Sequence, residues 1–430
     1  MSDTVVLRGA TLIDGTDREP IAHAVLAVRG ETIVATGEGE IPEGARILDC
    51  SGKTIMPGLV SNHAHVGLVD GADVGPGHYT RPNILRQLAQ YEAYGVTTVT
   101  SLGLNGALFC ELRDEMHAGK HPGADLFGVD RGVGVPNGAP PEAMFPLGND
   151  QLFRPRTPAE ARAAVREMAD RRTDFVKLWL DDFAGALPVK MSPAIYEAVI
   201  DEAHARGVRV AAHIHDLEDA RAVARAGVDL IAHGVRDAPV DEAFVRLLEA
   251  NGTWYVPTLA LDESTFAYAE RPVWTADLFT QHALQPALRA RFDDPAWRAR
   301  TLHEPKSAAA RASLATNLRN LKTLHDAGIS IGFGADSGGT PLRVPGVSEH
   351  RELALMVEAG LTPLQAIRMA TRHAAALLQL GDRGVLAPGK RADFIVLDAD
   401  PSHTIANTKA ISAVWHRGRP VRGPIETFVP

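Results

Sequence analysis

The chain has 430 residues, a length that suits a large α/β domain with an accessory domain. Hydrophobic residues make up 45% of it and charged residues 23%, so a large core can form without disulfide bonds. Lysine and arginine number 44 against 53 aspartates and glutamates, and the net charge of −9 argues against binding nucleic acid. The two cysteines, Cys50 and Cys110, exclude a disulfide framework and a cysteine-rich zinc or iron–sulfur site.

Histidine, by contrast, is abundant, with 17 residues. Neutral imidazole is the commonest metal ligand among side chains, so we expect function to lie among the histidines. The first residues lack the pattern of a signal peptide, and no apolar run reaches the length that crosses a bilayer. We therefore expect a cytoplasmic protein that binds neither nucleic acid nor membranes.

Short β-type runs separated by glycine fill the first part of the chain, up to Met56. Beyond that point, apolar β-branched segments alternate with stretches of helical period, several of which end at glycine. We count eight such segments: Leu59–His65, Val96–Leu102, Leu126–Val133, Phe175–Leu180, Arg209–His215, Leu230–Val235, Trp254–Leu259 and Ile329–Asp336.

This alternation predicts an α/β protein with a (β/α)8 TIM barrel over residues 57–380. An aromatic-rich insertion at about 262–304 is expected to be helical. The tail returns to strand-like sequence, so residues 1–56 and 381–430 are expected to pair into one small, discontinuous β-sandwich domain.

Several of the predicted strands end on, or contain, side chains that can ligate metal. Functional groups of such a barrel gather at the carboxyl ends of its strands, so these side chains are expected at one site. Each alone has an ordinary structural explanation, but their recurrence at equivalent positions indicates a metal-dependent enzyme. They are His63 and His65 on the first strand, Lys177 on the fourth, His213 and His215 on the fifth, His233 on the sixth and Asp336 on the eighth.

This order of residues resembles the amidohydrolase superfamily, in particular its binuclear members with a carboxylated lysine. Other similar motifs are Met56–Val60, Val256–Leu259, Leu361–Ile367 and Gly384–Asp393. Within the superfamily, the chain looks most like the Xaa-Pro dipeptidase-like and imidazolonepropionase-like members.

The resemblance implies a site with two divalent metal ions, bridged by a carbamylated Lys177. His63, His65 and Asp336 would bind one ion, and His213 and His233 the other. A hydroxide shared by the two metals would attack the substrate, with Asp336 as general acid and base. Nitrogen and oxygen ligands favour zinc, with manganese, cobalt or iron as substitutes.

His215 leaves an alternative open. Counted from His215, the run to Glu218 forms a His-x-x-Glu pattern similar to that of mononuclear metal-dependent deaminases of the same superfamily. In that interpretation Lys177 is structural; in the binuclear one, His215 is a catalytic residue near the metals or orients the substrate.

The leading hypothesis is a hydrolase of C–N bonds in small amides such as dipeptides or N-acyl amino acids. Alternatives are the deaminase, a lactone or carbamate hydrolase, and a non-catalytic binding module, which the intact ligand set disfavours. A homo-oligomer is expected from the resemblance. Candidate substrate-binding residues are His78, Tyr79, Arg131, Arg343 and His350, and the 262–304 insertion is a candidate lid.

Overall fold

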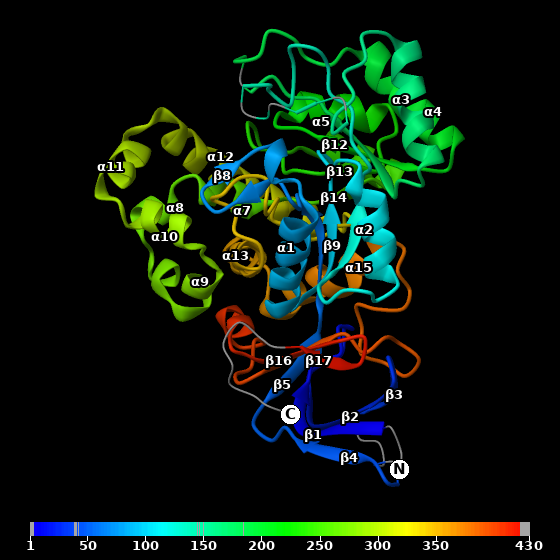
Figure 1. Ribbon diagram of the computed structural model, residues 1–430, viewed down its shortest axis with the longest axis vertical. Coiled ribbons are helices and arrows are strands. Elements are labelled where there is room, and N and C mark those ends of the chain that lie inside the picture. Colours follow the sequence, from blue (N-terminus) through cyan, green and yellow to red (C-terminus); the bar gives the residue numbers. More distant parts are fainter. Residues whose placement is uncertain are drawn as a thin grey trace.

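The computed structural model describes residues 4–37, 41, 43–143, 145, 147–148, 150–183 and 185–421. It is a mixed α/β structure with a body of parallel strands and helices, an antiparallel-rich sheet beneath it and a helical arm at one side (Figure 1). Among the described residues, no helix is both long and apolar enough to cross a membrane.

The sheet beneath the body contains strands from both ends of the chain. Its order is β17-β16-β15-β5-β1-β2-β3, with β4 paired to β1. The two ends meet where β5 pairs antiparallel with β15, Met56 lying opposite Ile395. Its strands are β1 (Thr4–Leu12), β2 (Ile21–Arg29), β3 (Thr32–Gly37), β4 (Arg46–Asp49), β5 (Thr54–Pro57), β15 (Phe394–Leu397), β16 (Ile411–His416) and β17 (Arg419–Val421).

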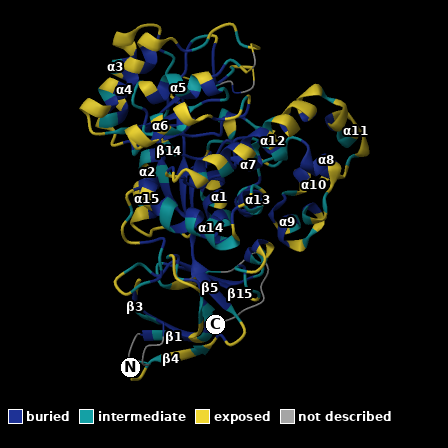
Figure 2. Cartoon of the chain, turned by 180° about the vertical axis from the view of Figure 1, so that it is seen from behind, coloured by how far each residue is buried: buried dark blue, intermediate teal, exposed yellow. Residues whose placement is uncertain are grey.

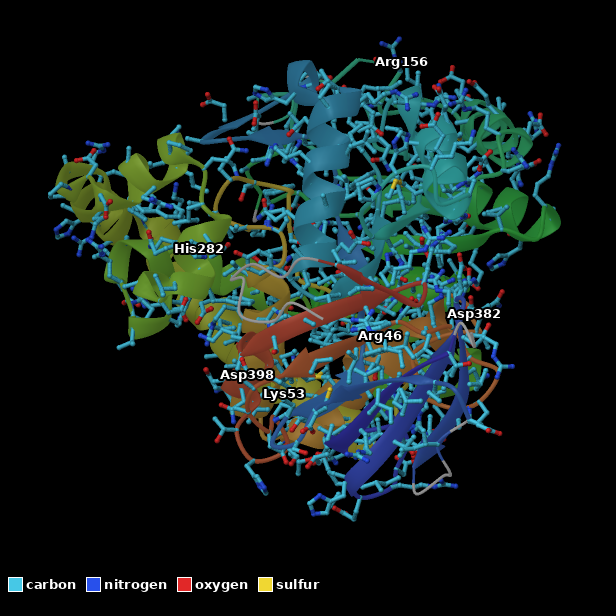
Figure 3. The ribbon with its side chains drawn as sticks, turned by 60° about the horizontal axis from the view of Figure 1, so that its bottom comes forward. Arg46, Lys53, Arg156, His282, Asp382 and Asp398 are labelled. Atoms are coloured by element: carbon cyan, nitrogen blue, oxygen red, sulfur yellow. The ribbon has the colours of Figure 1, made fainter. Side chains whose placement is uncertain are left out.

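Apolar packing and one ion pair hold the two ends together. In the core of this sheet, Leu7, Leu12 and Ile55 from the first end cluster with Phe394 and Trp415 from the second, whose rings stack 5.2 Å apart. At its surface, Lys53 Nζ lies 2.5 Å from Asp398 Oδ1, and the two residues are neighbours in Figure 3. The expected pairing of the chain's ends is therefore present as one hydrogen-bonded sheet, while the division into domains stays a prediction.

The body is built on short, buried parallel strands. Two sheets, β10-β9-β6 and β11-β12-β13-β14, are joined by isolated parallel bridges. Val133 bridges to Leu178, Tyr255 to Ile331 and Ser337 to Ala64. The strands are β6 (Leu59–Ala64), β9 (Val96–Ser101), β10 (Asp125–Gly128), β11 (Phe175–Trp179), β12 (Arg209–His213), β13 (Leu230–Ile231) and β14 (Trp254–Tyr255).

Helices surround these strands, and Figure 2 shows buried residues along the strands and exposed ones on the outer sides of helices such as α3 and α4. This is the pattern expected when each helix buries one face against a sheet. The helices are α1 (Arg81–Ala93), α2 (Leu108–His117), α3 (Pro158–Asp170), α4 (Pro193–Ala205), α5 (Leu217–Arg225), α6 (Glu242–Asn251), α12 (Pro305–Asp326), α13 (Val347–Glu358), α14 (Pro363–Arg368) and α15 (Ala374–Leu377), with a π-helix η3 (Met369–His373) between the last two.

Short helices form the arm, which corresponds to the predicted insertion at about 262–304. Pro286, Pro295 and Pro305 each begin a helix, because a proline at the first helical position loses no backbone hydrogen bond. The arm comprises α7 (Leu259–Ser264), α8 (Ala267–Glu270), η2 (Val273–Ala276), α9 (Leu278–Ala283), α10 (Pro286–Asp293) and α11 (Pro295–His303). Smaller elements elsewhere are β7 (Val69–Asp70), β8 (Asp73–Val74), η1 (Pro76–His78) and η4 (Ile405–Lys409).

Candidate metal centre

Main-chain hydrogen bonds align the end of β6 with residues 336 and 337. The amide of Asp336 donates to the His63 carbonyl at 3.0 Å, and the amide of His65 donates to the Ser337 carbonyl at 2.7 Å. Gly334 permits this close approach, because a Cβ there would lie 2.6 Å from the His63 nitrogen. Asp336 has a φ of 53°, an uncommon conformation for a residue other than glycine. The backbone thus sets the three side chains against one another.

The side chains of His63, His65 and Asp336 converge on one point. Asp336 Oδ1 lies 3.2 Å from His63 Nε2 and 3.1 Å from His65 Nε2. The other ring nitrogen of each histidine faces a carbonyl: His63 Nδ1 lies 2.6 Å from the Ala232 oxygen, and His65 Nδ1 lies 3.0 Å from the Gly103 oxygen. Each Nδ1 therefore carries the proton and each Nε2 presents a lone pair toward Asp336.

The two ring nitrogens and the Asp336 oxygen form a group that can hold a cation. Burial lowers the pKa of His63 to about 3, so its ring is neutral. Despite their proximity, His63 Nε2 and Asp336 Oδ1 make no hydrogen bond with each other, and both are buried without a hydrogen-bond partner among the described residues. The three potential ligand atoms lie within 4.8 Å of one another. The donor set therefore fits a divalent metal ion with nitrogen and oxygen ligands.

Lys177 lies in the middle of β11 and is fully buried. Its Nζ has no hydrogen-bond partner within the part of the chain that the structure describes, although unpartnered buried ammonium groups are rare. Burial lowers the pKa of this amine to about 7, while the charge of Asp336 acts in the opposite direction. The Nζ lies 5.4 Å from the centre of the Trp179 ring. Lys177 is thus a buried amine without a structural ion pair.

His213 and His233 extend the cluster on its other side. The His233 ring is 4.4 Å from that of His63 and 4.3 Å from that of His213, measured between centres. His213 Nε2 lies 3.0 Å from Asp181 Oδ2, and His233 Nδ1 lies 2.9 Å from the Thr258 hydroxyl. Each ring is therefore held through one nitrogen, which leaves the other available as a ligand.

A cavity of about 420 Å³ opens above these residues. His65, His213, His233 and Asp336 lie in its lining, together with His215, whose Nδ1 is 2.7 Å from Asp216 Oδ1. One part of the wall is apolar, formed by Leu104, Phe145, Trp179, Phe183 and Leu261. The volume is typical of pockets for small molecules.

Comparison with known proteins decides the family. The Amidohydrolase family matches residues 54–423. The chain belongs to this family. It is 26% identical over 444 residues to imidazolonepropionase from Streptomyces griseus, with 97% of each chain covered. It is 24% identical over 436 residues to 5-methylthioadenosine/S-adenosylhomocysteine deaminase from Pelotomaculum thermopropionicum, covering 93% of this chain and 86% of the deaminase.

A solved structure shares the fold of this amidohydrolase. The crystal structure of a Xaa-Pro dipeptidase with bound methionine matches it with a TM-score of 0.77 and 23% identity, over 97% of this chain and 99% of the other. The predicted family membership is therefore confirmed. The protein is a hydrolase that acts on carbon–nitrogen bonds.

Arg343 lies in the cavity of the amidohydrolase, but it is engaged by the protein itself. Its Nη1 lies 2.8 Å from Asp336 Oδ2, the carboxylate oxygen that faces away from the histidines. This ion pair is the largest of the contributions that hold the pKa of Asp336 well below its usual range, against the effect of burial. Arg343 therefore orients Asp336 and keeps its carboxylate charged.

The other predicted substrate-binding residues do not line this cavity. Arg131 stacks over Phe153 at 4.0 Å and its Nε lies 3.3 Å from Asp130. His350 is buried in α13, where its Nδ1 lies 2.9 Å from the Thr408 hydroxyl and its Nε2 2.9 Å from the Tyr94 carbonyl.

His78 and Tyr79 lie in and directly after η1, also outside the cavity lining. The carbonyl of His78 accepts a hydrogen bond from Asn83 Nδ2 at 2.9 Å. The ring of Tyr79 packs closely against Gly67 and Gly106, and burial raises the pKa of its hydroxyl. The structure thus gives both residues contacts within the fold.

Sequence reasoning did not select Asp181, Arg236 and Asp262, all of which line the cavity. Asp181 follows the fourth strand by two residues, so the strand-end rule that selected the histidines was sufficient to find it. Arg236 Nη1 lies 3.4 Å from Asp262 Oδ1, and both side chains are buried. Arg236 directly follows the predicted sixth strand, so the strand-end rule applies to it as well, whereas Asp262 lies within α7 and no such rule selects it.

Proposed function

We propose that this amidohydrolase cleaves amide bonds of small molecules such as dipeptides or N-acyl amino acids at a binuclear metal site. The observation that carries the proposal is the buried Lys177 amine, which has no hydrogen-bond partner among the described residues, close to His63 and to an equally unpartnered Asp336 oxygen. Carbamylation would convert this amine into an anion with two oxygen ligands, which would add a second anionic ligand beside the Asp336 carboxylate.

The residues divide into two ligand groups. His63, His65 and Asp336 would hold one divalent ion, and His213 and His233 the second, with carbamylated Lys177 between them. Zinc suits this set of nitrogen and oxygen donors best, with manganese, cobalt or iron as substitutes. Two such ions supply Lewis-acid polarisation of the scissile carbonyl and lower the pKa of bound water toward neutrality.

The protein's own residues perform the remaining tasks. Asp336 accepts the proton that water loses during the attack and delivers it to the leaving nitrogen. Arg343 holds the same carboxylate in place, and His215 orients the substrate. The apolar wall around Trp179 and Phe183 binds a non-polar substituent and excludes water from the reacting amide.

The fold that positions these residues is, in this proposal, the eight-stranded barrel. The bridges at Val133, Ile331 and Ser337 support it, since they connect the two parallel sheets in the order that closure requires. The five predicted metal-binding strands would then open onto one face.

The test combines metal analysis with a substrate screen. Purified protein should contain about two metal equivalents per chain and release amino acid from dipeptides or N-acyl amino acids. Lys177→Met keeps the side chain's volume without its nitrogen. This variant should bind less metal than the wild type, and its rate of hydrolysis should fall by at least about 100-fold. Full activity of this variant would contradict the bridged site.

A mononuclear deaminase is the second candidate, favoured by the full-length similarity to the Pelotomaculum deaminase. Its expected proton carrier, Glu218, has a side chain that is 79% exposed and lies 3.0 Å from Arg221 on the same helix. The deaminase predicts ammonia release from aminopurines, about one metal per chain and an inactive Glu218→Gln variant. The amide hydrolase predicts that Glu218→Gln behaves as wild type. Lactone and carbamate substrates in the same screen test the remaining alternative.

A further inference from the structure

Helix α7 begins directly after Thr258, yet Thr258 does not cap it. A threonine at this position normally accepts a hydrogen bond from one of the first free amides of the helix through its hydroxyl. In this protein the Thr258 side chain makes no such bond. Its hydroxyl lies instead 2.9 Å from Nδ1 of His233. Thr258 also has a φ of 46°, which is strained for a β-branched residue.

The amides that Thr258 leaves free are bound by Glu352. The Leu259 amide donates to Glu352 Oε1 at 2.9 Å and the Ala260 amide donates to Glu352 Oε2 at 2.7 Å. Glu352 lies on α13, 92 residues or more along the chain from these partners. Its side chain is completely buried. A carboxylate is rarely buried without an ion pair, so a buried glutamate that binds two backbone amides indicates a specific structural role.

Glu349, one turn earlier on α13, is also buried and acts on the opposite side of the site. It accepts a hydrogen bond from Ser337, the residue that follows Asp336, and a second one from the Gly346 amide at 2.8 Å. Helix α13 therefore extends one carboxylate toward the Asp336 segment and another toward the Thr258 segment. Neither glutamate lines the cavity.

We infer that Glu352 is a positioning residue for the second metal ligand group, acting through the amides of α7 and the hydroxyl of Thr258 on His233. By capping α7 from another helix, Glu352 leaves the Thr258 hydroxyl free to accept the Nδ1 proton of His233. The ring is then fixed as the tautomer whose Nε2 is a ligand. Without Glu352, the Thr258 hydroxyl would turn to its own helix and release His233. This inference rests on the proposed binuclear site.

The experiment measures how tightly each metal is held. Wild type and variants, loaded with zinc, are dialysed against increasing concentrations of a chelator, and bound zinc per chain is determined. Glu352→Gln replaces one acceptor oxygen by an NH2 group, which cannot accept a hydrogen bond from a backbone N–H. Thr258→Val removes the hydroxyl directly. Glu358→Gln is the matched control, because Glu358 lies on the same helix with a side chain that is 56% exposed.

In the expected result, both variants lose one zinc at a chelator concentration about 10- to 100-fold lower than wild type, and hold the other unchanged. The double variant should show no further loss, since both changes interrupt one pathway. Glu358→Gln should match wild type. Retention of both ions with wild-type affinity by Thr258→Val would overturn the inference, whether or not Glu352→Gln folds. Equal weakening of both ions by Glu352→Gln would also overturn it. A wild type without metal would instead refute the proposed function.

Discussion

His416 makes the stability of the protein depend on pH in a direction that can be tested. It lies on β16, with Nδ1 at 2.6 Å from Glu92 Oε1 and Nε2 at 3.8 Å from Asp125 Oδ1. Burial opposes its charge, but the carboxylates of Asp125 and Glu92 outweigh this effect and raise its pKa from 6.5 to about 9. Between these two values the folded protein holds a proton that the unfolded chain releases.

The stabilisation is therefore fully present below pH 6.5 and is lost as the pH rises through about 9. Each unit of difference between the folded and unfolded pKa values is worth about 1.4 kcal/mol, so the loss amounts to about 3 kcal/mol of unfolding free energy. His416→Gln keeps a hydrogen-bonding group but cannot titrate. Its destabilisation relative to wild type should be largest below pH 6.5 and should shrink by about 3 kcal/mol toward pH 9.

Urea unfolding followed by tryptophan fluorescence across this pH range measures the difference. His403→Gln is the control, because the His403 side chain is 84% exposed. A free-energy difference between wild type and His416→Gln that stays constant with pH would refute the reasoning, since it would mean that His416 carries no extra proton in the folded state.

Two further predictions concern other buried charges. Asp125→Asn removes the buried carboxylate shared by Arg383, Arg391 and Arg417. Loss of this common charge should lower the unfolding free energy by about 3–5 kcal/mol, measurable as a reduced thermal midpoint. Arg343→Met removes the ion pair with Asp336, whose loss should cost about 1.5–3 kcal/mol, and should lower kcat about 10- to 100-fold with little change in KM. A raised KM with unchanged kcat would show instead that Arg343 binds substrate.

The cluster of candidate ligands was predictable because parallel strands place their carboxyl ends on one face. His63, His65 and Asp336 lie within one cluster although more than 270 positions of sequence separate them, as the strand-end rule requires. The observed strands are shorter than predicted: the sixth is reduced to Leu230–Ile231 and the eighth to a bridge at Ile331. The pattern of apolar residues marks which segments are buried, whereas strand length depends on where the ladder of hydrogen bonds is interrupted.

Substrate-facing residues were less predictable, because position after a strand does not determine where a long side chain points. Arg131 follows the third strand but turns outward to Glu167 and the Phe153 ring. His350 is a predicted substrate-binding residue, but its two ring nitrogens contact Thr408 and the Tyr94 carbonyl and so pack α13 against η4 and the end of α1. Both positions depend on contacts between elements far apart in the sequence, which periodicity does not reveal.

The same limitation explains why the supports of the metal ligands escaped sequence reasoning. Glu349 and Glu352 lie three residues apart on a helix, a spacing that in sequence is equally typical of a solvated face. In the structure both are buried, and burial raises the pKa of Glu349 to about 7 and that of Glu352 to about 8. Two carboxylates in such surroundings reduce stability unless their backbone partners are worth more than the lost hydration. Their partners lie on the Thr258 segment and on the Asp336 segment, so both carboxyl groups fix the order of the candidate site at the cost of their own burial.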